Sequence, residues 1–169
     1  MSERDIAALL SVTAEIAALE DADPFPPQLV ARVAGLIANH EATYCELDRG
    51  TERFISASWW CEGEGAIEVA GDEHDSTYWR LRHTHPTCGY RERTNDWTSV
   101  RKVSDFATQR EFRRTAIWNA AYRGEDVNYW IDVGLRPTGT QTHMFIFSRG
   151  ARDYDERDRL VLELLQPHL

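Results

Sequence analysis

The sequence predicts an α+β protein with a mostly antiparallel central sheet, and two observations lead to this prediction. Apolar residues recur at helical spacing near both ends of the chain, over 4–19, 27–39 and 154–169. Between these stretches lie two pairs of β-prone segments, each joined by a short polar turn as in antiparallel hairpins. Helices that flank hairpin-forming strands, rather than alternating with single strands, are typical of the α+β class.

The first two helices form an N-terminal helical pair over residues 1–40. In the first helix, Ile6, Leu9 and Leu10 begin a series of apolar residues that covers nearly half of the helix surface. The segment DADPFPP (21–27) ends this helix and starts the next. Proline suits the first turn of a helix because no backbone N–H is needed there.

The region 41–150 is expected to form the sheet and a cleft. In its last strand, Met144 and Ile146 alternate with Phe145 and Phe147, so both faces of that strand are apolar. We therefore expect other elements to cover both faces of the sheet. The predicted strands pair as 42–48 with 53–60 and as 127–136 with 142–150.

The segments between the two strand pairs carry weaker signals. The Gly-rich, acidic stretch after the first pair predicts a surface loop, and the stretch that begins with HPTCG is turn-rich and predicts irregular structure. Thr108, followed three residues later by Glu111, has the pattern of a helix N-cap. The expected loop, short helix, irregular segment, strand and helix lie at 61–73, 75–83, 85–97, 99–106 and 108–123.

The composition is that of a globular protein, expected to form a single domain over residues 1–169. The formal net charge of -9 and the pI of about 5.1 argue against direct nucleic-acid binding, since phosphate contacts need clustered Lys and Arg. No apolar run approaches the roughly 18 residues of a membrane span. The N-terminus, MSERDIAALL, is acidic where a signal peptide is basic. We therefore expect a cytoplasmic protein without membrane contact.

Some basic residues do gather in the second half of the chain. Acidic residues are interspersed among them, which predicts a solvated surface of mixed charge. These basic residues are Arg91, Arg93, Arg101, Lys102, Arg110, Arg113 and Arg114.

Candidate metal ligands and nucleophiles lack a supporting motif. His74, His83, His85 and Cys88 are close in sequence, but their spacing matches no standard zinc site. No catalytic signature surrounds the cysteines, and the chain has no phosphate-binding loop. We therefore expect no metal, no cofactor and no catalytic residue, and a small stand-alone enzyme is the less favoured alternative.

The aromatic content is more suggestive, because the chain has six Trp, six Tyr and six Phe residues. Tryptophan and tyrosine can line an apolar cavity and direct polar groups at a ligand. The alternative is that these aromatic residues form the core. The candidate ligand-binding residues are Tyr44, Trp59, Trp79, His83, Trp118 and Trp130.

Several segments resemble the sensory domain of bacterial LuxR-type transcription regulators. They are the closing stretch SRGARDYDERDRLVLELLQPHL, the segment SDFATQREFRRTAIWNAAYR (104–123), the His85-Pro86 pair and YCELD (44–48). The resemblance covers most of the chain from about Leu29 to Leu169. It implies a GAF-like fold, with a central antiparallel sheet, helices on one face and a possible ligand cleft on the other.

The resemblance also implies a function. In that family a helix-turn-helix domain follows the P-H-L helix, and this sequence stops before it. We therefore expect a sensory domain that responds to a small-molecule effector and reaches DNA only through a downstream domain. The pattern of tryptophan, tyrosine and aspartate used by acyl-homoserine-lactone receptors is not evident here, so the identity of the ligand is not implied.

The last helix predicts a contact with a partner. Asp155 suits the N-cap, and Pro167 predicts an end or a kink near Gln166. The apolar side chains of this connector, 151–169, span roughly 200°, which is more than one sheet contact needs. We expect a homodimer through the surplus apolar residues of the first and last helices, Leu9, Ile16, Leu162, Leu165 and Leu169. Two alternatives stay open: the first helix of the same chain covers the surplus leucines, or the domain is a dimerisation module without a ligand.

Overall fold

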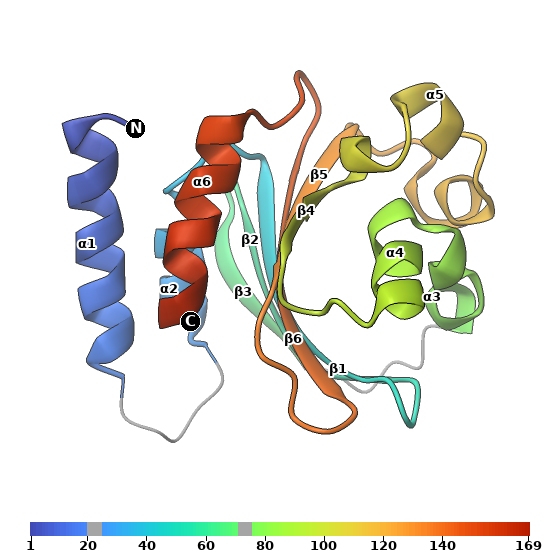
Figure 1. Ribbon diagram of the computed structural model, residues 1–169, viewed down its shortest axis with the longest axis horizontal. Coiled ribbons are helices and arrows are strands. Elements are labelled where there is room, and N and C mark those ends of the chain that lie inside the picture. Colours follow the sequence, from blue (N-terminus) through green and yellow to red (C-terminus); the bar gives the residue numbers. More distant parts are fainter. Residues whose placement is uncertain (20–24, 71–75) are drawn as a thin grey trace.

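The computed structural model describes residues 1–19, 25–70 and 76–169 and is built on one six-stranded antiparallel sheet. Across the sheet the strand order is β3-β2-β1-β6-β5-β4 (Figure 1). The predicted strand pairs are therefore confirmed, and β1 and β6 join them at the centre of the sheet. The strands are β1 (Glu41–Asp48), β2 (Arg53–Cys61), β3 (Gly65–Ala70), β4 (Val100–Lys102), β5 (Tyr129–Gly134) and β6 (Gln141–Arg149).

Two helices pack on one face of the sheet, α2 (Pro27–Ala34) and α6 (Glu156–Leu165), and α1 (Glu3–Ala17) packs on the outer side of both. They lie on the left of the sheet in Figure 1, where α1 and α6 run side by side. Phe145 and Phe147 of β6 are fully buried in the core beneath these helices. This core contains most of the buried aliphatic residues of the chain, so the three helices and the sheet form the main hydrophobic layer.

Short helical segments cover the opposite face, as the apolar residues on both faces of β6 predict. They are α3 (Ser76–Leu81), α4 (Pro86–Thr94), α5 (Gln109–Phe112) and a π-helical turn (Trp118–Tyr122), and they lie on the right in Figure 1. The central antiparallel sheet of an α+β fold is confirmed. The expected GAF-like arrangement places helices on one face and a possible cleft on the other, and the structure adds a roof of short helical segments on that second face.

The prediction of a loop over 61–73 is wrong for Gly65–Ala70, although residues 62–64 do form a turn. Residues Gly65–Ala70 form β3, which pairs with β2. Gly63 and Gly65 both have φ of +89°, so the glycines build the turn and not the whole segment. Residues 71–73, and His74 of the candidate metal cluster, lie outside the described residues.

The prediction of irregular structure over 85–97 is also wrong, because this segment contains α4. Pro86 occupies the first turn, and Asn95 ends the helix in the left-handed conformation with φ of 58°. Gly89 reduces the helical propensity of the segment, yet its backbone lies close to the carbonyl of His83. A Cβ at that position would be 2.6 Å from His83 O, so packing and not propensity selects this glycine.

Three other predicted elements are present but shorter or interrupted. Thr108 caps α5 as expected, since its Oγ1 accepts a hydrogen bond from Glu111 N at 3.3 Å and the Glu111 side chain accepts from Thr108 N. The α-helix nevertheless ends at Phe112, and a π-helical turn follows. The second helix ends at Ala34 rather than at Asn39, whose side chain donates to Ala34 O. The strand predicted over 99–106 is reduced to β4 and a 3₁₀ turn.

The helix α6 begins and ends as predicted, but its exposed face differs from the prediction. Asp155 Oδ1 accepts a hydrogen bond from Asp158 N at 3.0 Å, and the α-helix ends before Pro167. Leu162 and Leu165 are fully buried in the chain's own core, so they are not surplus residues. Leu160 and Leu164 are exposed in their place, at 42% and 40%.

The remaining dimer candidates are also largely covered within the chain. Leu9 is buried, and Ile16 and Leu169 are half-buried against the same core. These residues therefore fit the alternative in which the first helix of the same chain covers the surplus leucines, since α1 lies next to α6. The large apolar side chains that α1 leaves exposed are Ile6 and Leu10.

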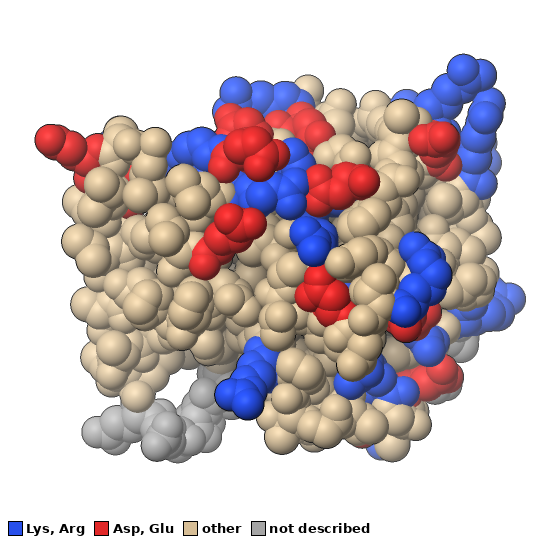
Figure 2. Space-filling view, in the orientation of Figure 1, with Lys and Arg blue, Asp and Glu red and all other residues tan. Residues whose placement is uncertain are grey.

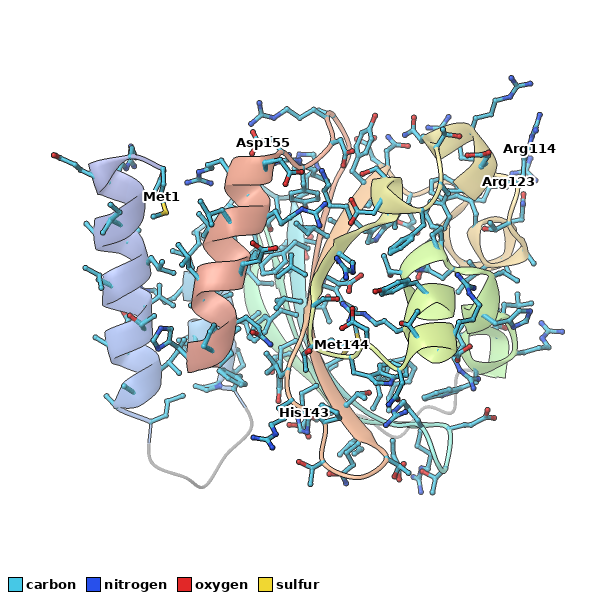
Figure 3. All side chains as sticks on the ribbon, in the orientation of Figure 1. Met1, Arg114, Arg123, His143, Met144 and Asp155 are labelled. Atoms are coloured by element: carbon cyan, nitrogen blue, oxygen red, sulfur yellow. The ribbon has the colours of Figure 1, made fainter. Side chains whose placement is uncertain are left out.

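Charged side chains gather in the middle and on the right of the surface seen in Figure 2, where both signs lie next to each other as predicted. Arg114 and Arg123 extend from the edge remote from α1 (Figure 3). Arg91 is the exception in the predicted basic group, because it is completely buried and paired with Asp132. Among the described residues, no helix is long and apolar enough to cross a membrane.

Candidate functional site

A cavity of about 350 Å³ lies between the sheet and the helical roof of its second face. Its volume falls in the range of small-molecule sites, which is roughly 300–1,000 Å³. Alternate residues of β1, β5 and β6 form the floor, because successive side chains of a strand point to opposite faces. Polar and aromatic groups share the lining: Glu41, Thr43, Cys45, His85, Thr87, Cys88, Asp132 and Ser148, with Phe54, Tyr78, Tyr122 and Trp130.

Strand register explains how distant parts of the sequence meet in this floor. Asp132 of β5 pairs with Ile146 of β6, and Ile146 pairs with Thr43 of β1, so these three form one row across the sheet. The neighbouring row contains Trp130, Ser148 and Glu41, and a third contains Met144 and Cys45. Met144 faces the cavity, while His143, next to it in the chain, lines a pocket on the opposite side of the sheet (Figure 3).

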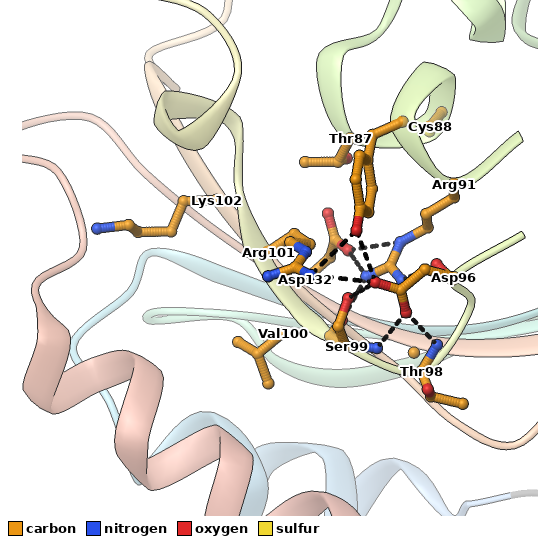
Figure 4. Close-up of polar contacts among 12 residues, drawn as sticks. Thr87, Cys88, Arg91, Asp96, Thr98, Ser99, Val100, Arg101, Lys102 and Asp132 are labelled. Carbon is orange, nitrogen blue, oxygen red and sulfur yellow. Dashed lines mark hydrogen bonds and ion pairs between the residues drawn. The ribbon is translucent and has the colours of Figure 1, made fainter. Parts of the chain in front are cut away.

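A buried ion pair defines the polar wall of the cavity. Arg91 of α4 donates to Asp132 Oδ1 from Nε at 3.0 Å and also from Nη2. Its remaining donors bind backbone carbonyls, Nη1 to Asp96 O at 2.9 Å and Nη2 to Ser99 O at 2.7 Å (Figure 4). The guanidinium is completely buried and Asp132 is 3% exposed. A buried charge needs such compensation, so each of these residues requires the other.

His85 adds a second polar group to this wall. It is 6% exposed, and its Nδ1 lies 3.2 Å from Thr87 Oγ1. Burial lowers the pKa of His85 to about 4, although the charge of Asp132 opposes that shift. At neutral pH the imidazole is therefore uncharged, and it contributes hydrogen bonding rather than charge.

The two thiols in the cavity are in a protonated state at neutral pH. Burial raises the pKa of Cys45 and that of Cys88 to about 12. Since the thiolate is the reactive form of cysteine, neither residue is an activated nucleophile. No group of three or more His, Cys, Asp or Glu residues within the described part of the chain could hold a metal ion.

The structure brings only some of the predicted ligand-binding residues to this cavity. Trp130 lines it directly. Trp79 is buried and lines an adjoining pocket of about 290 Å³, which shares Tyr78 and Met144 with the cavity. Trp59 shares a row with Thr43 on the cavity side of the sheet, but it is half-buried beyond the lining.

The other three predicted residues lie elsewhere. Tyr44 is on the opposite face, under the α1–α2–α6 layer, where its ring packs on Phe145 and its hydroxyl donates to Glu46 at 2.8 Å. Trp118 packs in the small core behind the cavity. His83 is exposed and does not contribute to the lining, because the 3₁₀ turn that contains it directs His85 inward instead.

Sequence reasoning missed Asp132 and assigned no ligand-binding role to His85. The signal for Asp132 is a single carboxylate within the apolar strand YWIDVG, where a charge needs a buried partner. No pattern in the sequence identifies Arg91 as that partner, since the two residues are 41 positions apart.

Solved structures with the same fold are numerous, although the chain matches no family model and no curated protein by sequence. The VqsR LBD domain from Pseudomonas aeruginosa has a TM-score of 0.58 at 13% identity, over 98% of this chain and 92% of that chain. The GAF domain of an Acinetobacter phosphoenolpyruvate-protein phosphotransferase has a TM-score of 0.56 at 14% identity, over 99% and 91%.

Two further neighbours differ in function from each other. The N-acylhomoserine-lactone-dependent LuxR family transcription factor CepR2 from Burkholderia cenocepacia has a TM-score of 0.53 at 11% identity, over 98% of this chain and 93% of that chain. Free methionine-R-sulfoxide reductase from Neisseria meningitidis has a TM-score of 0.55 at 12% identity, over 99% and 91%. At these identities the likeness establishes the fold alone. The chain therefore has a GAF-like fold.

Proposed function

We propose that the chain is a non-catalytic sensory domain of a LuxR-type transcription regulator that acts in the cytoplasm and binds a small molecule in the cavity above β1, β5 and β6. The observation that carries this proposal is a cavity of about 350 Å³ with a buried aspartate, an uncharged histidine and aromatic rings in its lining. Such a combination of apolar walls and few polar groups is typical of ligand sites. Neighbours of the same fold include an LBD domain and a LuxR family transcription factor.

Three of the six tryptophans could have filled the cavity as part of an aromatic core, but they do not. Trp59, Trp79 and Trp118 are all absent from the residues that line it. This arrangement supports a ligand site over a simple aromatic core. DNA would be contacted only through a further helix-turn-helix domain.

A screen for ligand-induced stabilisation tests the proposal. Purified chain is heated with each member of a metabolite library, and a ligand that binds only the folded state raises Tm. Ala121 lines the cavity, whereas Ala120 in the same π-helical turn does not. We expect Ala121→Phe to abolish the ligand-induced rise and Ala120→Phe to retain it. If no library member stabilises the chain, or if Ala121→Phe responds unchanged, this proposal is wrong.

A catalytic role is less well supported by the same residues. A general base works best with a pKa near the working pH, and the pKa of His85 is about 4. The thiols are protonated, for the reason given above. We infer that ligand binding, and not turnover, is the activity of the cavity.

Exposed apolar side chains favour dimerisation as a second function, with or without a ligand. Ile6 and Leu10 are four residues apart on α1, and Leu160 and Leu164 are four residues apart on α6, so each pair lies on one side of its helix. We propose that these residues, rather than the buried leucines, form a homodimer contact. Light scattering that shows a monomer at high concentration would exclude it.

A further inference from the structure

We propose that the cavity selects a compact organic cation, a ligand that carries a protonated amine next to an apolar or aromatic body. This inference rests on the proposed function and specifies the chemistry of the ligand. It derives from the sign of the charges in the lining, from two carboxylate oxygens that accept no hydrogen bond from the described residues, and from the aromatic ring beside them.

The charged side chains that line the cavity are both acidic. They are Asp132 and Glu41, and no Lys or Arg side chain is among the lining residues. His85 supplies no positive charge at neutral pH, because burial lowers its pKa to about 4. An anionic ligand would therefore meet two carboxylates without a compensating cation in contact with it.

Asp132 presents one oxygen to the cavity. Both of its hydrogen bonds from Arg91 go to Oδ1, and Oδ2 accepts none from the described residues. The Oδ2 atom is also not among the buried polar atoms that are sealed from solvent without a partner. Arg91 approaches from the α4 side and is completely buried. Its guanidinium therefore holds the Asp132 carboxylate in place but does not itself line the cavity. Oδ2 is thus held ready to accept an N–H donor from a ligand.

Glu41 supplies a second acceptor on the neighbouring row. Its Oε2 accepts a hydrogen bond from Ser148 Oγ at 3.1 Å, and its Oε1 accepts none within the described part of the chain. Trp130 belongs to the same row, two residues from Asp132 along β5. A cation near Asp132 would lie close to this indole, and ammonium groups bind favourably over such rings. The cavity volume also limits the size of the ligand, because about 350 Å³ is about twelve times the liquid volume of a water molecule.

Three probes of matched shape test this selection: 2-phenylethylamine, 2-phenylethanol and 3-phenylpropionate. Binding to the full chain at pH 7 is followed by calorimetry and by NMR shifts of Trp130 and Thr87. We expect the amine to bind at least tenfold more tightly than the alcohol, and the carboxylate not to bind. An alcohol that binds as tightly as the amine, a carboxylate that binds, or an amine that does not bind would each overturn the proposed charge selection.

Paired variants attribute the effect to the cavity carboxylates. Glu41→Gln is expected to weaken amine binding three- to tenfold, whereas Glu46→Gln, on the opposite face of the same strand, should leave it unchanged. Asp132→Asn should abolish the preference for the amine over the alcohol. If this variant does not fold because Arg91 loses its partner, the comparison of Glu41→Gln with Glu46→Gln still tests the proposal. Equal effects of these two substitutions on amine binding would overturn it.

The outcomes separate this inference from the proposed function. If the metabolite library yields only neutral or anionic ligands that depend on Ala121, the sensory cavity stands and the charge selection is wrong. If the library yields no ligand at all, the proposed function is wrong.

Discussion

The Arg91–Asp132 pair fixes the polar wall of the cavity through a single side chain with four hydrogen bonds. Arg91 donates two hydrogen bonds to Asp132 Oδ1 and one each to the backbone carbonyls of Asp96 and Ser99. Its planar guanidinium matches this arrangement, and a lysine amine does not. The guanidinium thus connects α4, the loop before β4 and β5 at one point.

Arg91→Met is expected to lower the free energy of unfolding by about 3–5 kcal/mol, because it leaves the buried Asp132 carboxylate without a counter-charge. Urea unfolding followed by circular dichroism measures this loss. The control is Arg32→Met on α2, which removes an exposed ion pair with Glu15 and should leave the unfolding midpoint nearly unchanged. Equal midpoints for both variants would contradict the assignment of a compensating role to Arg91.

The buried imidazole of His85 predicts a dependence of stability on pH. Its pKa is about 4 in the folded chain against 6.5 when exposed, so between these values the unfolded state binds a proton that the folded state does not. The stabilisation is therefore complete above pH 6.5 and is lost as pH falls towards 4, by on the order of 3 kcal/mol. His85→Gln should flatten the unfolding free energy between pH 6.5 and 4.5 relative to the unmodified chain. Parallel curves for the two proteins would show that His85 is not the group that titrates.

At the scale of elements, the long periodic helices and the strand pairs could be predicted because each is encoded by its own residues. The capping residues Ser2, Thr108 and Asp155 are all at the positions that begin helices. The helix α4 could not be predicted in this way, because Gly89 and the turn-forming residues around it oppose a helix locally. Its formation depends on contacts with distant segments, above all the pairing of Arg91 with β5.

The same dependence on a distant contact makes Gly134 of β5 sensitive to substitution. A Cβ at this position would lie 1.7 Å from the backbone oxygen of Trp97, so the loop before β4 would have to move. Gly134→Ala is expected to reduce stability by about 1–3 kcal/mol, as overpacking does. Gly35→Ala is the control, since its φ is -66° and its nearest contact would be 3.4 Å, and it should raise stability by roughly 0.5 kcal/mol. Thermal unfolding compares the two, and a neutral Gly134→Ala would contradict the close approach.

At the scale of the whole molecule, the sheet separates an apolar layer from the ligand cavity. The layer of α1, α2 and α6 contains the large core, and the face of α1 visible in Figure 2 is mostly uncharged below its first turn. The sequence predicted the width of the apolar arc on α6 but not which leucines face outward. The rotation of α6 about its axis is set by Arg149, Asp158 and Tyr154, which meet only in the folded chain.

A dimer through the exposed leucines is testable at this scale. We expect Leu10→Glu and Leu164→Glu each to weaken self-association at least tenfold, because a charge would enter an apolar contact. Ile55→Glu is the matched control, since Ile55 is an exposed apolar residue on β2, away from α1 and α6. Size-exclusion chromatography with light scattering reports the outcome, and equal effects of all three substitutions would exclude this surface.

Two consecutive residues at the end of β6 connect the cavity with the last helix. Ser148 lines the cavity and donates to Glu41, while Arg149 binds Ala38 O, Asp153 O and the Asp158 side chain at the start of α6. Because no flexible segment separates the two side chains, a ligand that displaces Ser148 would also displace the first turn of α6. We therefore expect binding at Glu41 to change the hydrogen exchange of the α6 amides before that of the α1 amides. This strand end would then act as a direct mechanical connection from an occupied cavity to α6.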